Sequence, residues 1–575
     1  PAGVTFHELR ATIDPASATV PKPVVRDLAG LSVACSAPEH ALFSDDGCYH
    51  AVATDSCVLV RAVAGSWVLE VPVRRVVRMA FSPRGTYLVT WARQEQPGAK
   101  NLLVWAVRAA AEAAQRRAEA PVAAFVRKVA AECVCWPLLC WSGDERYCAR
   151  VCAECVEVVP GDACGSTRPL LRLGVRGVGL VDWCPVPHRP RAPAAGSDYL
   201  LGVFCRPHGT EPGFVAIYDA DPSRGKHAAR EPLSQRSFAR ADSCSIKWNP
   251  AAARGQPQAL LATVESDQDA SGMSYYGESS LYILFADKPH LNGLVPLRKK
   301  GNIHDVAWAP NGKLFAVVSG YMPAMTAVYE MQPNGHAVLR ASLGPLARNV
   351  VRFSPDSRLL FVGGFGNLAG DMDLFDTDKF AVVGRANAHT TTQWEWSPDG
   401  AFICCAVAAP RRHVDNGFHL FAVNGQLVLS VMVPELYDFA WQPAPETTRA
   451  ALESPPPRPK APADTEARAG IPHTTSLSPA AVAAAAEAAA AMPAGKYVPP
   501  HMRAAAAAKS AQQQQQQRQA QQHKEPSMKV YARDGTVQKQ KGGEAKQQPQ
   551  AQKQQQQAKP KPKKQANPQM CRRGF

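Results

Sequence analysis

The sequence lacks the features that place a chain in a membrane or direct it to secretion. No segment approaches the 18 consecutive apolar residues of a membrane span, and the alanine-rich run 480–491 is interrupted by Glu487. Residues 1–8 show neither the basic region nor the apolar region of a secretory signal. We therefore expect a cytoplasmic protein with no membrane partner, whose 16 cysteines are reduced thiols.

Motifs of catalysis are also missing. No Gly-x-x-x-x-Gly-Lys-Ser/Thr loop is present, and the glycine-rich stretch 363–370 lacks the Gly-x-Gly-x-x-Gly spacing, which favours a hairpin with a close backbone approach over a phosphate loop. His389, His413 and His419 lie near aspartates, but no serine stands in a nucleophile elbow. We expect no enzyme and no cofactor.

A zinc site is the alternative interpretation of the cysteines at 152–155, which form one Cys-x-x-Cys pair. A strong zinc signal would show a second such pair at regular spacing, whereas the nearby thiols alternate with strand-forming Val and Trp. Buried free thiols are the favoured interpretation, so we predict no metal.

Aromatic residues are scarce in the last quarter of the chain. All 11 Trp lie between Trp67 and Trp441, and only three aromatic residues follow Pro443. Residues 444–575 hold 21 Lys/Arg against 8 Asp/Glu, and therefore most of the net charge of +15. Such Pro-, Ala-, Gln- and Lys-rich sequence buries too little apolar area to offset its ordering entropy. We predict a globular domain over 1–443 and a disordered basic tail over 444–575.

A short phrase recurs nine times in the globular part: an aromatic residue, a small or polar residue, Pro or Asp, and then a turn before a fresh apolar run. Five of the eight gaps between its aromatic residues lie between 38 and 45 residues, close to the length of a four-stranded propeller blade. The pattern predicts an all-β, WD-repeat-like β-propeller of nine blades, or of seven or eight if a mark is misread, with two β-sandwiches as the alternative. The aromatic residues of the nine phrases are Phe43, Phe81, Trp141, Trp183, Trp248, Trp308, Phe353, Trp396 and Trp441. All of them except Phe43 are expected to be structural anchors of the blades.

The basic tail is the clearest physical indication of a partner. Flexible cationic chain can neutralise phosphates and release counterions without reading sequence, so RNA is the expected polyanion. A merely solubilising tail, tubulin and acidic lipid are the alternatives. The clustered cations are Lys559, Lys561, Lys563, Lys564, Arg572 and Arg573.

Several motifs together resemble the eukaryotic translation initiation factor 2A family in order and spacing. They include Ile246-Lys247-Trp248-Asn249, Trp394-Glu395-Trp396-Ser397-Pro398-Asp399-Gly400 and the stretches 274–278, 303–310, 320–324, 363–368, 410–417 and 441–443. Lys496 and the following 497–503 are similar to the family's short Tyr-x-Pro-Pro-x-x-Arg element, which ends here at Arg503. The resemblance spans about residues 40–503, and the glutamine tracts depart from the family's Lys/Glu-rich C-terminal region.

The resemblance implies a factor that directs initiator methionyl-tRNA to the small ribosomal subunit, in a codon-dependent and GTP-independent manner, on selected mRNAs. Its expected partners are the small subunit, the tRNA, the mRNA and other initiation factors. The alternative is a propeller scaffold for protein partners, like the b subunit of initiation factor 3, although no RNA-recognition motif is found before residue 40.

Binding residues are expected in loops of the propeller rather than in its core. Tyr275, Tyr276 and Glu278 combine aromatic faces for base stacking with a polar contact, and Arg411 and Arg412 can pair with phosphates. The alternative is intramolecular: the two tyrosines pack between blades, and Arg411 pairs with Asp415 in the same loop. Lys496 and Arg503 join the expected RNA contacts.

Overall fold

The computed structural model describes residues 41–126, 136–186, 197–225, 231–254, 256–267, 277–332, 334–409 and 411–444, together with four short strands before residue 35. Strands dominate: the only α-helix in these ranges is α1 (Val107–Glu112), accompanied by the 3-10 turns η3 (Pro222–Arg224), η4 (Ala252–Arg254) and η5 (Pro289–Leu291). None of the helices within the described ranges combines the length and the hydropathy that a bilayer crossing requires.

Eight antiparallel sheets each contain four strands that are consecutive in the chain. The first four are β5 (Ala41–Phe43), β6 (Tyr49–Ala53), β7 (Val58–Ala62), β8 (Val68–Val71); β9 (Val76–Phe81), β10 (Tyr87–Ala92), β11 (Leu102–Ala106), β12 (Ala123–Phe125); β13 (Leu139–Trp141), β14 (Tyr147–Val151), β15 (Val156–Pro160), β16 (Leu171–Leu173); and β17 (Val178–Trp183), β18 (Leu200–Cys205), β19 (Gly213–Asp219), β20 (Ser234–Phe238).

The second four sheets follow the same order along the chain. They are β21 (Ser243–Trp248), β22 (Ala259–Ser266), β23 (Glu278–Phe285), β24 (Gly293–Leu294); β25 (Ile303–Trp308), β26 (Leu314–Ser319), β27 (Ala324–Met331), β28 (Ala337–Leu346); β29 (Val350–Phe353), β30 (Leu359–Gly363), β31 (Asp371–Asp376), β32 (Val382–Asn387); and β33 (Gln393–Trp396), β34 (Phe402–Val407), β35 (Gly417–Ala422), β36 (Leu427–Met432).

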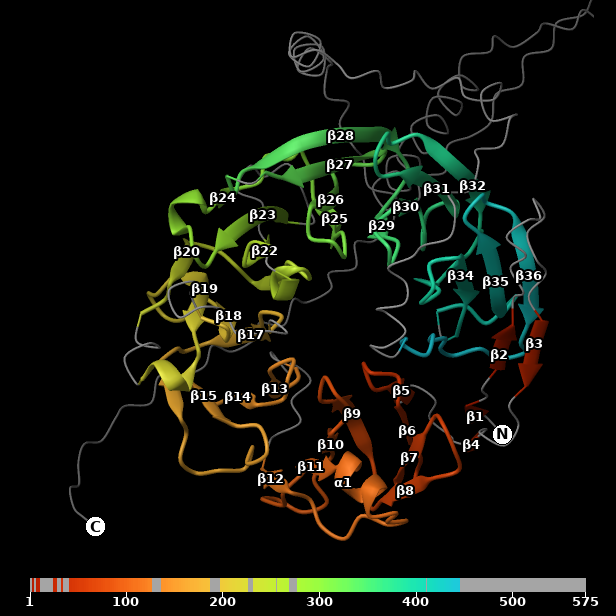
Figure 1. Ribbon diagram of the computed structural model, residues 1–575. Coiled ribbons are helices and arrows are strands. Elements are labelled where there is room, and N and C mark those ends of the chain that lie inside the picture. Colours follow the sequence, from red (N-terminus) through yellow and green to blue (C-terminus); the bar gives the residue numbers. More distant parts are fainter. Residues whose placement is uncertain are drawn as a thin grey trace, which may run out of the picture. The chain divides into compact units, whose positions relative to one another are not determined.

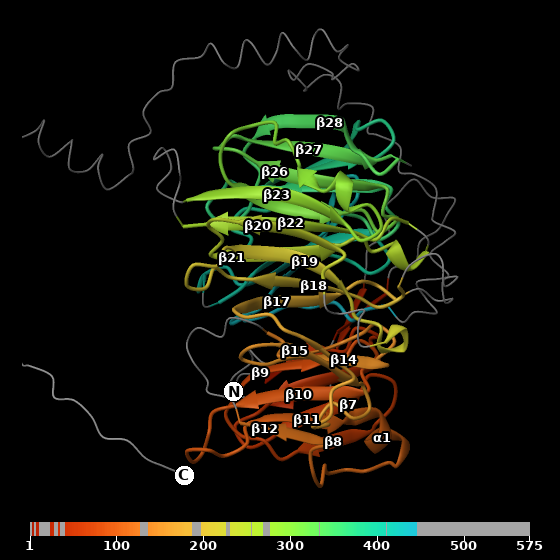
Figure 2. The same cartoon turned by 90° about the vertical axis from the view of Figure 1, so that its left-hand side faces the viewer.

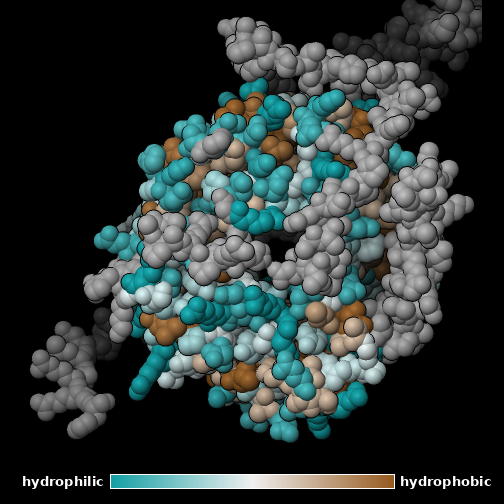
Figure 3. Space-filling view, viewed as in Figure 1, coloured by the Kyte–Doolittle hydropathy of each residue, from teal (hydrophilic) through white to brown (hydrophobic). Residues whose placement is uncertain are grey.

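The sheets stand side by side in a ring, with the first strand of a sheet toward the centre and the fourth at the rim (Figure 1). Seen from the side, the strands of successive sheets lie stacked above one another (Figure 2). The face in Figure 3 is mainly hydrophilic, with apolar residues scattered over it. This arrangement confirms the predicted all-β propeller.

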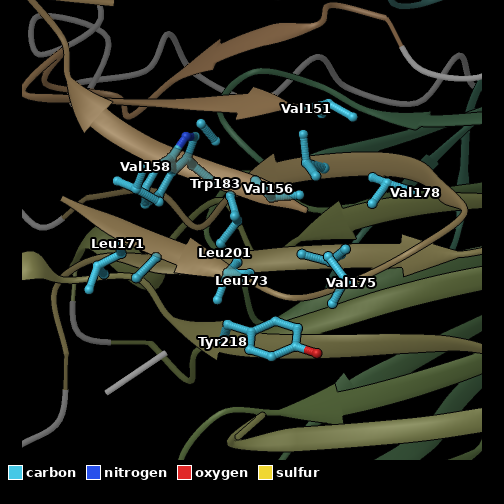
Figure 4. Packing of buried hydrophobic residues seen from close by; sticks show 14 of the residues in the cluster. Val151, Val156, Val158, Leu171, Leu173, Val175, Val178, Trp183, Leu201 and Tyr218 are labelled. Carbon is cyan, nitrogen blue, oxygen red and sulfur yellow. The ribbon is translucent and has the colours of Figure 1, made fainter. Parts of the chain in front are cut away.

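The core consists of apolar layers between neighbouring sheets. Strand alternation sends every second side chain of β14, β15 and β16 toward β17–β19, where they are buried against that sheet (Figure 4). Burial of each large apolar side chain contributes about 1.5–3 kcal/mol. Members of this layer are Val151, Val156, Val158, Leu171, Leu173, Val175, Val178, Trp183, Leu201 and Tyr218.

The recurring phrase is a turn held by its own side chains. Ser354 Oγ donates to Asp356 Oδ1 at 2.5 Å and accepts the backbone N–H of Leu359 at 3.0 Å. The same serine-to-aspartate bond joins Ser44 to Asp46, Ser142 to Asp144 and Ser397 to Asp399. In two of these turns a glycine follows at positive φ, Gly47 at 68° and Gly400 at 69°, which is why glycine suits that position.

Tryptophans of the phrase connect one sheet to the next. The indole Nε1 of Trp183 donates to the Cys140 carbonyl at 2.8 Å, that of Trp248 to the Asp182 carbonyl at 3.2 Å, and that of Trp308 to the Lys247 carbonyl at 2.9 Å. Each acceptor is the residue before the aromatic anchor of the preceding sheet. Trp141, Trp183, Trp248, Trp308 and Phe353 are buried, whereas Phe81, Trp396 and Trp441 are half-buried.

Eight of the nine predicted marks end the first strand of a four-stranded sheet, and the ninth behaves differently. Trp441, Gln442 and Pro443 follow β36 and belong to no strand. Gln442 Nε2 nevertheless donates to the Gly47 carbonyl of the first sheet at 2.9 Å, much as Asn249 Nδ2 donates to Gly312 at 3.2 Å in the next sheet. The ninth mark therefore links the last sheet to the first.

The N-terminal strands form two further ladders. β1 (Gly3–Val4) pairs with β4 (Val33–Ala34), and β2 (His7–Arg10) pairs with β3 (Val24–Asp27), all antiparallel. The described ranges thus hold eight four-stranded sheets and two two-stranded ladders, whereas the sequence predicts nine blades.

Removal of one inter-sheet indole hydrogen bond should destabilise the ring. Trp248→Phe removes the indole donor to the Asp182 carbonyl and part of the ring that fills the space between the sheets, so we expect the free energy of unfolding to fall by about 2–3 kcal/mol. Trp396→Phe is the matched control, because its buried Nε1 has no partner within the described ranges, and should cost only about 1 kcal/mol. Urea unfolding followed by tryptophan fluorescence measures both, and equal losses would contradict the role of this bond.

Candidate nucleic-acid interface

Loops of the last three sheets gather at one face of the ring. In each sheet the loop between the second and third strands returns to the end where the first strand begins, because consecutive strands are antiparallel. In the last three sheets these loops are 320–323, 364–370 and 408–416, which we call the loop face. The corresponding loop of the β21–β24 sheet, 267–277, contains Tyr275 and Tyr276, which lie outside the described residues.

The structure brings two of the predicted binding residues together on the loop face. Arg411 and Arg412 are adjacent and exposed in loop 408–416. Glu278 is exposed at the start of β23, opposite Ser266. The remaining predicted contacts lie outside the described residues: Lys496, Arg503, Lys559, Lys561, Lys563, Lys564, Arg572 and Arg573.

Arg411 does not form the intramolecular ion pair that was its alternative interpretation. Within the described ranges no ion pair joins it to Asp415. Its guanidinium instead lies over Gly366 of the neighbouring loop, where an added Cβ would stand 2.7 Å from Nη2. Gly366 has a positive φ of 76°, a backbone conformation that favours glycine.

A cleft of about 380 Å³ opens between the three loops. Its walls combine aromatic and apolar side chains with cationic and amide groups. The lining residues are His304, Met322, Asn349, Val350, Phe365, Gly366, Asn367, Leu368, Thr392, Trp394 and Arg411. Aromatic faces beside a guanidinium provide the two kinds of contact that single-stranded nucleic acid uses.

The cleft is built on a rigid base. Asn349 holds loop 364–370 through both atoms of its amide: Nδ2 donates to the Phe365 carbonyl at 3.1 Å, and Oδ1 accepts the Phe365 N–H at 2.9 Å. Phe365 is buried and packs beside Trp394, with ring centroids 6.0 Å apart. An added Cβ at Gly364 would lie 2.2 Å from the Ala347 carbonyl oxygen, which confirms the predicted close-approach hairpin at 363–370.

Large apolar side chains stand exposed around the cleft. Tyr321 is 50% exposed, Met322 40% and Val414 63%. Sequence reasoning did not assign these residues, nor Phe365 and Trp394, to the site. The motifs at 320–324, 363–368 and 410–417, which carry the family resemblance, could have indicated this site, because all three fall on these loops.

An ion-pair network links the first strands beneath the loop face. Asp305 of β25 accepts the Val351 N–H at 3.0 Å and Arg352 Nη1 at 2.8 Å, both on Oδ2. Lys247 Nζ of β21 lies 3.6 Å from Asp305 Oδ1, and burial lowers the pKa of Lys247 although the aspartate opposes that shift. One carboxylate thus connects three neighbouring sheets and fixes the spacing of their loops.

Neutralising that carboxylate should loosen the three sheets. Asp305→Asn keeps the shape but leaves the Lys247 and Arg352 cations without their counter-charge, so we expect a loss of about 1–3 kcal/mol in the free energy of unfolding. Asp162→Asn, at an exposed aspartate in the loop between β15 and β16, is the control and should change little. Denaturant midpoints measure both, and an unaltered Asp305→Asn midpoint would count against the network.

The part of the chain that forms the loop face matches a known protein family. The family profile described as eukaryotic translation initiation factor eIF2A matches residues 236–439, the region that forms the loop face. Eukaryotic translation initiation factor 2A of Schizosaccharomyces pombe is 31% identical over 431 residues, covering 72% of this chain and 68% of that protein. The Dictyostelium discoideum protein of the same name is 29% identical over 407 residues, covering 70% of this chain and 61% of its own length.

A crystal structure described as that of "the eukaryotic initiation factor" has 27% identity and a TM-score of 0.59, covering 74% of this chain and 97% of that one. The b subunit of eukaryotic translation initiation factor 3 from Bombyx mori is more distant, at 23% identity over 64% of this chain and 49% of that protein. The matched regions span about two thirds of the initiation factor 2A relatives or less. The chain belongs to the eukaryotic translation initiation factor 2A family.

Proposed function

We propose that this protein is a translation initiation factor that directs initiator methionyl-tRNA to the small ribosomal subunit, in a codon-dependent and GTP-independent manner, on selected mRNAs. It works by binding alone: the loop face docks on ribosomal RNA, and the basic tail adds contacts to RNA. The observation that carries the proposal is the aromatic and cationic cleft at 320–323, 364–370 and 408–416, on the part of the chain that matches the family.

The chemistry of the loop face supports an RNA ligand. Arg411 and Arg412 are exposed, and a guanidinium pairs with phosphate oxygens through a planar set of donors. Exposed Tyr321 and the ring of Trp394 offer faces on which unpaired bases can stack, a contact worth about 1–3 kcal/mol per base. The loops are braced by Asn349 and Asp305, so little ordering entropy opposes binding.

The tail supports the same ligand through charge alone. We propose that residues 1–443 form the propeller and that 444–575 form a basic region, with the Tyr-x-Pro-Pro-x-x-Arg element at 497–503 as a short docking segment. Its cations bind phosphates by releasing counterions and carry no sequence information. Recognition in this proposal therefore rests on the propeller, and the tail raises affinity.

Charge reversal on the loop face should weaken binding to the small ribosomal subunit. We expect full-length protein with Arg411→Glu and Arg412→Glu to bind purified small subunits at least about tenfold more weakly at low salt, with the slope of log K against log salt reduced by about 2. Lys313→Glu/Arg84→Glu is the matched control, because both residues occupy exposed positions in turns at the opposite face. Fluorescence anisotropy of labelled protein across a salt series gives both quantities.

Equal binding by the reversed protein and the control would contradict the loop face as the docking surface. A loss of ribosome binding without any change in the salt slope would instead indicate a protein contact. That result would favour the alternative function, a propeller scaffold for protein partners. The more distant similarity to the b subunit of initiation factor 3 is the observation that supports this alternative.

Neutralising the basic tail should weaken the binding of any tRNA. With Lys559, Lys561, Lys563 and Lys564 replaced by Gln, we expect a smaller salt slope and weaker binding to initiator tRNA and unrelated tRNA alike, because phosphate contacts are not specific. The same anisotropy titration with tRNA measures this. A selective loss of initiator tRNA would show that the tail carries recognition, contrary to the proposal.

A further inference from the structure

Five polar side chains share one face of the sheet β13–β16. Arg150 of β14 is paired in register with Glu157 of β15, and Glu157 with Arg172 of β16. The hairpin between β14 and β15 is closed by the Cys152 N–H, which donates to the Cys155 carbonyl at 2.9 Å. Because side chains alternate along a strand, both cysteines project on the same face as the arginines and Glu157. The opposite face carries the apolar layer of Figure 4.

Three potential ligand atoms converge at this hairpin. The two thiol sulfurs and one carboxylate oxygen of Cys152, Cys155 and Glu157 all lie within 4.8 Å of one another. A tetrahedral zinc ion, with Zn–S bonds of about 2.3 Å and Zn–O bonds of about 2.0 Å, requires its ligand atoms to lie about 3.3–3.8 Å apart. The ligand atoms must therefore approach one another by up to about 1–1.5 Å when the ion binds.

The carboxylate is already oriented for such a role. Arg150 Nε and Nη2 donate to Glu157 Oε2 at 3.2 and 2.7 Å, and the Cys152 thiol donates to the same oxygen at 3.5 Å. Within the described ranges no hydrogen bond to Oε1 is found. Oε1 can therefore bind a metal while Oε2 keeps Arg150, the arrangement in which a neighbouring group fixes a ligating carboxylate.

The surrounding charges balance a metal with three anionic ligands. Two thiolates, one carboxylate and a divalent cation sum to −1, and Arg150 and Arg172 stand beside them. Arg150 is only 9% exposed and is held by the carbonyls of Cys164 and Ser166 at 3.2 and 3.0 Å. Arg172 Nε donates to the Cys155 sulfur at 3.2 Å, a bond that a metal-bound thiolate can retain.

We propose that Cys152, Cys155 and Glu157 bind one thiophilic divalent cation, Zn²⁺, with water as the fourth ligand. Binding converts two thiols to thiolates and releases their two protons to solvent, with no oxidant or reductant involved. The site goes beyond the proposed function and does not depend on it. The sequence analysis held zinc at this Cys-x-x-Cys pair only as the alternative interpretation, because the third ligand comes from a strand, two residues after the pair, rather than from a second Cys-x-x-Cys.

Cobalt substitution tests the site in the full-length protein. After removal of metals by chelation, titration with Co²⁺ should produce a thiolate-to-cobalt charge-transfer band that saturates at one ion per chain and is bleached by Zn²⁺. We expect Cys152→Ser to weaken Co²⁺ binding at least tenfold and to lower the intensity of that band. Cys48→Ser is the matched control, since this exposed cysteine lies in the turn between β5 and β6, and should leave the titration unchanged.

Cys152 is replaced rather than Glu157, because Glu157 also neutralises buried Arg150 and its loss would affect folding. Folding of the Cys152 variant is still monitored separately. Circular dichroism and the melting temperature of Cys152→Ser should match those of the parent protein without metal. Absence of the charge-transfer band at saturating Co²⁺, or a band that Cys152→Ser leaves unchanged, overturns the proposal. Equal loss in Cys48→Ser and Cys152→Ser overturns it as well, since the ion would then bind elsewhere.

Discussion

The hydrogen bond from an anchor tryptophan to the first strand of the preceding sheet is the contact on which this ring depends. Trp183, Trp248 and Trp308 form it in succession, so three consecutive sheet boundaries share one geometry. The indole is large enough to fill the space between two sheets and polar enough to fix their offset. Gln442 closes the series by reaching Gly47 across the boundary between the last and first sheets.

Rigidity at the centre explains why the loops can form a binding face. Asp305 joins the first strands of three sheets. Asn349 fixes the loop that contains Phe365, one of the residues that line the cleft. The exposed Tyr321 and Arg411 therefore stand on a preorganised base and do not have to be ordered by the ligand. This gives a propeller with a repeated blade architecture a distinct surface at one face, made from loops that expose Tyr321 and Arg411 while burying Phe365 in the core.

The sheets could be predicted from the sequence because their determinants are local. In four of the turns a serine bonds an aspartate two residues on, two of these turns add a glycine at positive φ, and each mark contains the aromatic residue that packs beneath it. The loop face could not be predicted in the same way: Met322, Phe365 and Trp394 line one cleft only through strand direction and sheet order. Arg411 was found from its charge and motif. Glu157 was missed because strand register, which spacing does not reveal, places it beside Cys152.

The central claim is that the loop face docks on the small ribosomal subunit, and hydrogen–deuterium exchange of the full-length protein with and without ribosomal particles tests it most directly. The account predicts slower exchange at 320–323, 364–370 and 408–416 in the complex, with no change in the opposite-face turns at 310–313 and 398–401. Protection confined to those opposite turns, or no protection on either face while the small ribosomal particle is bound, would contradict it.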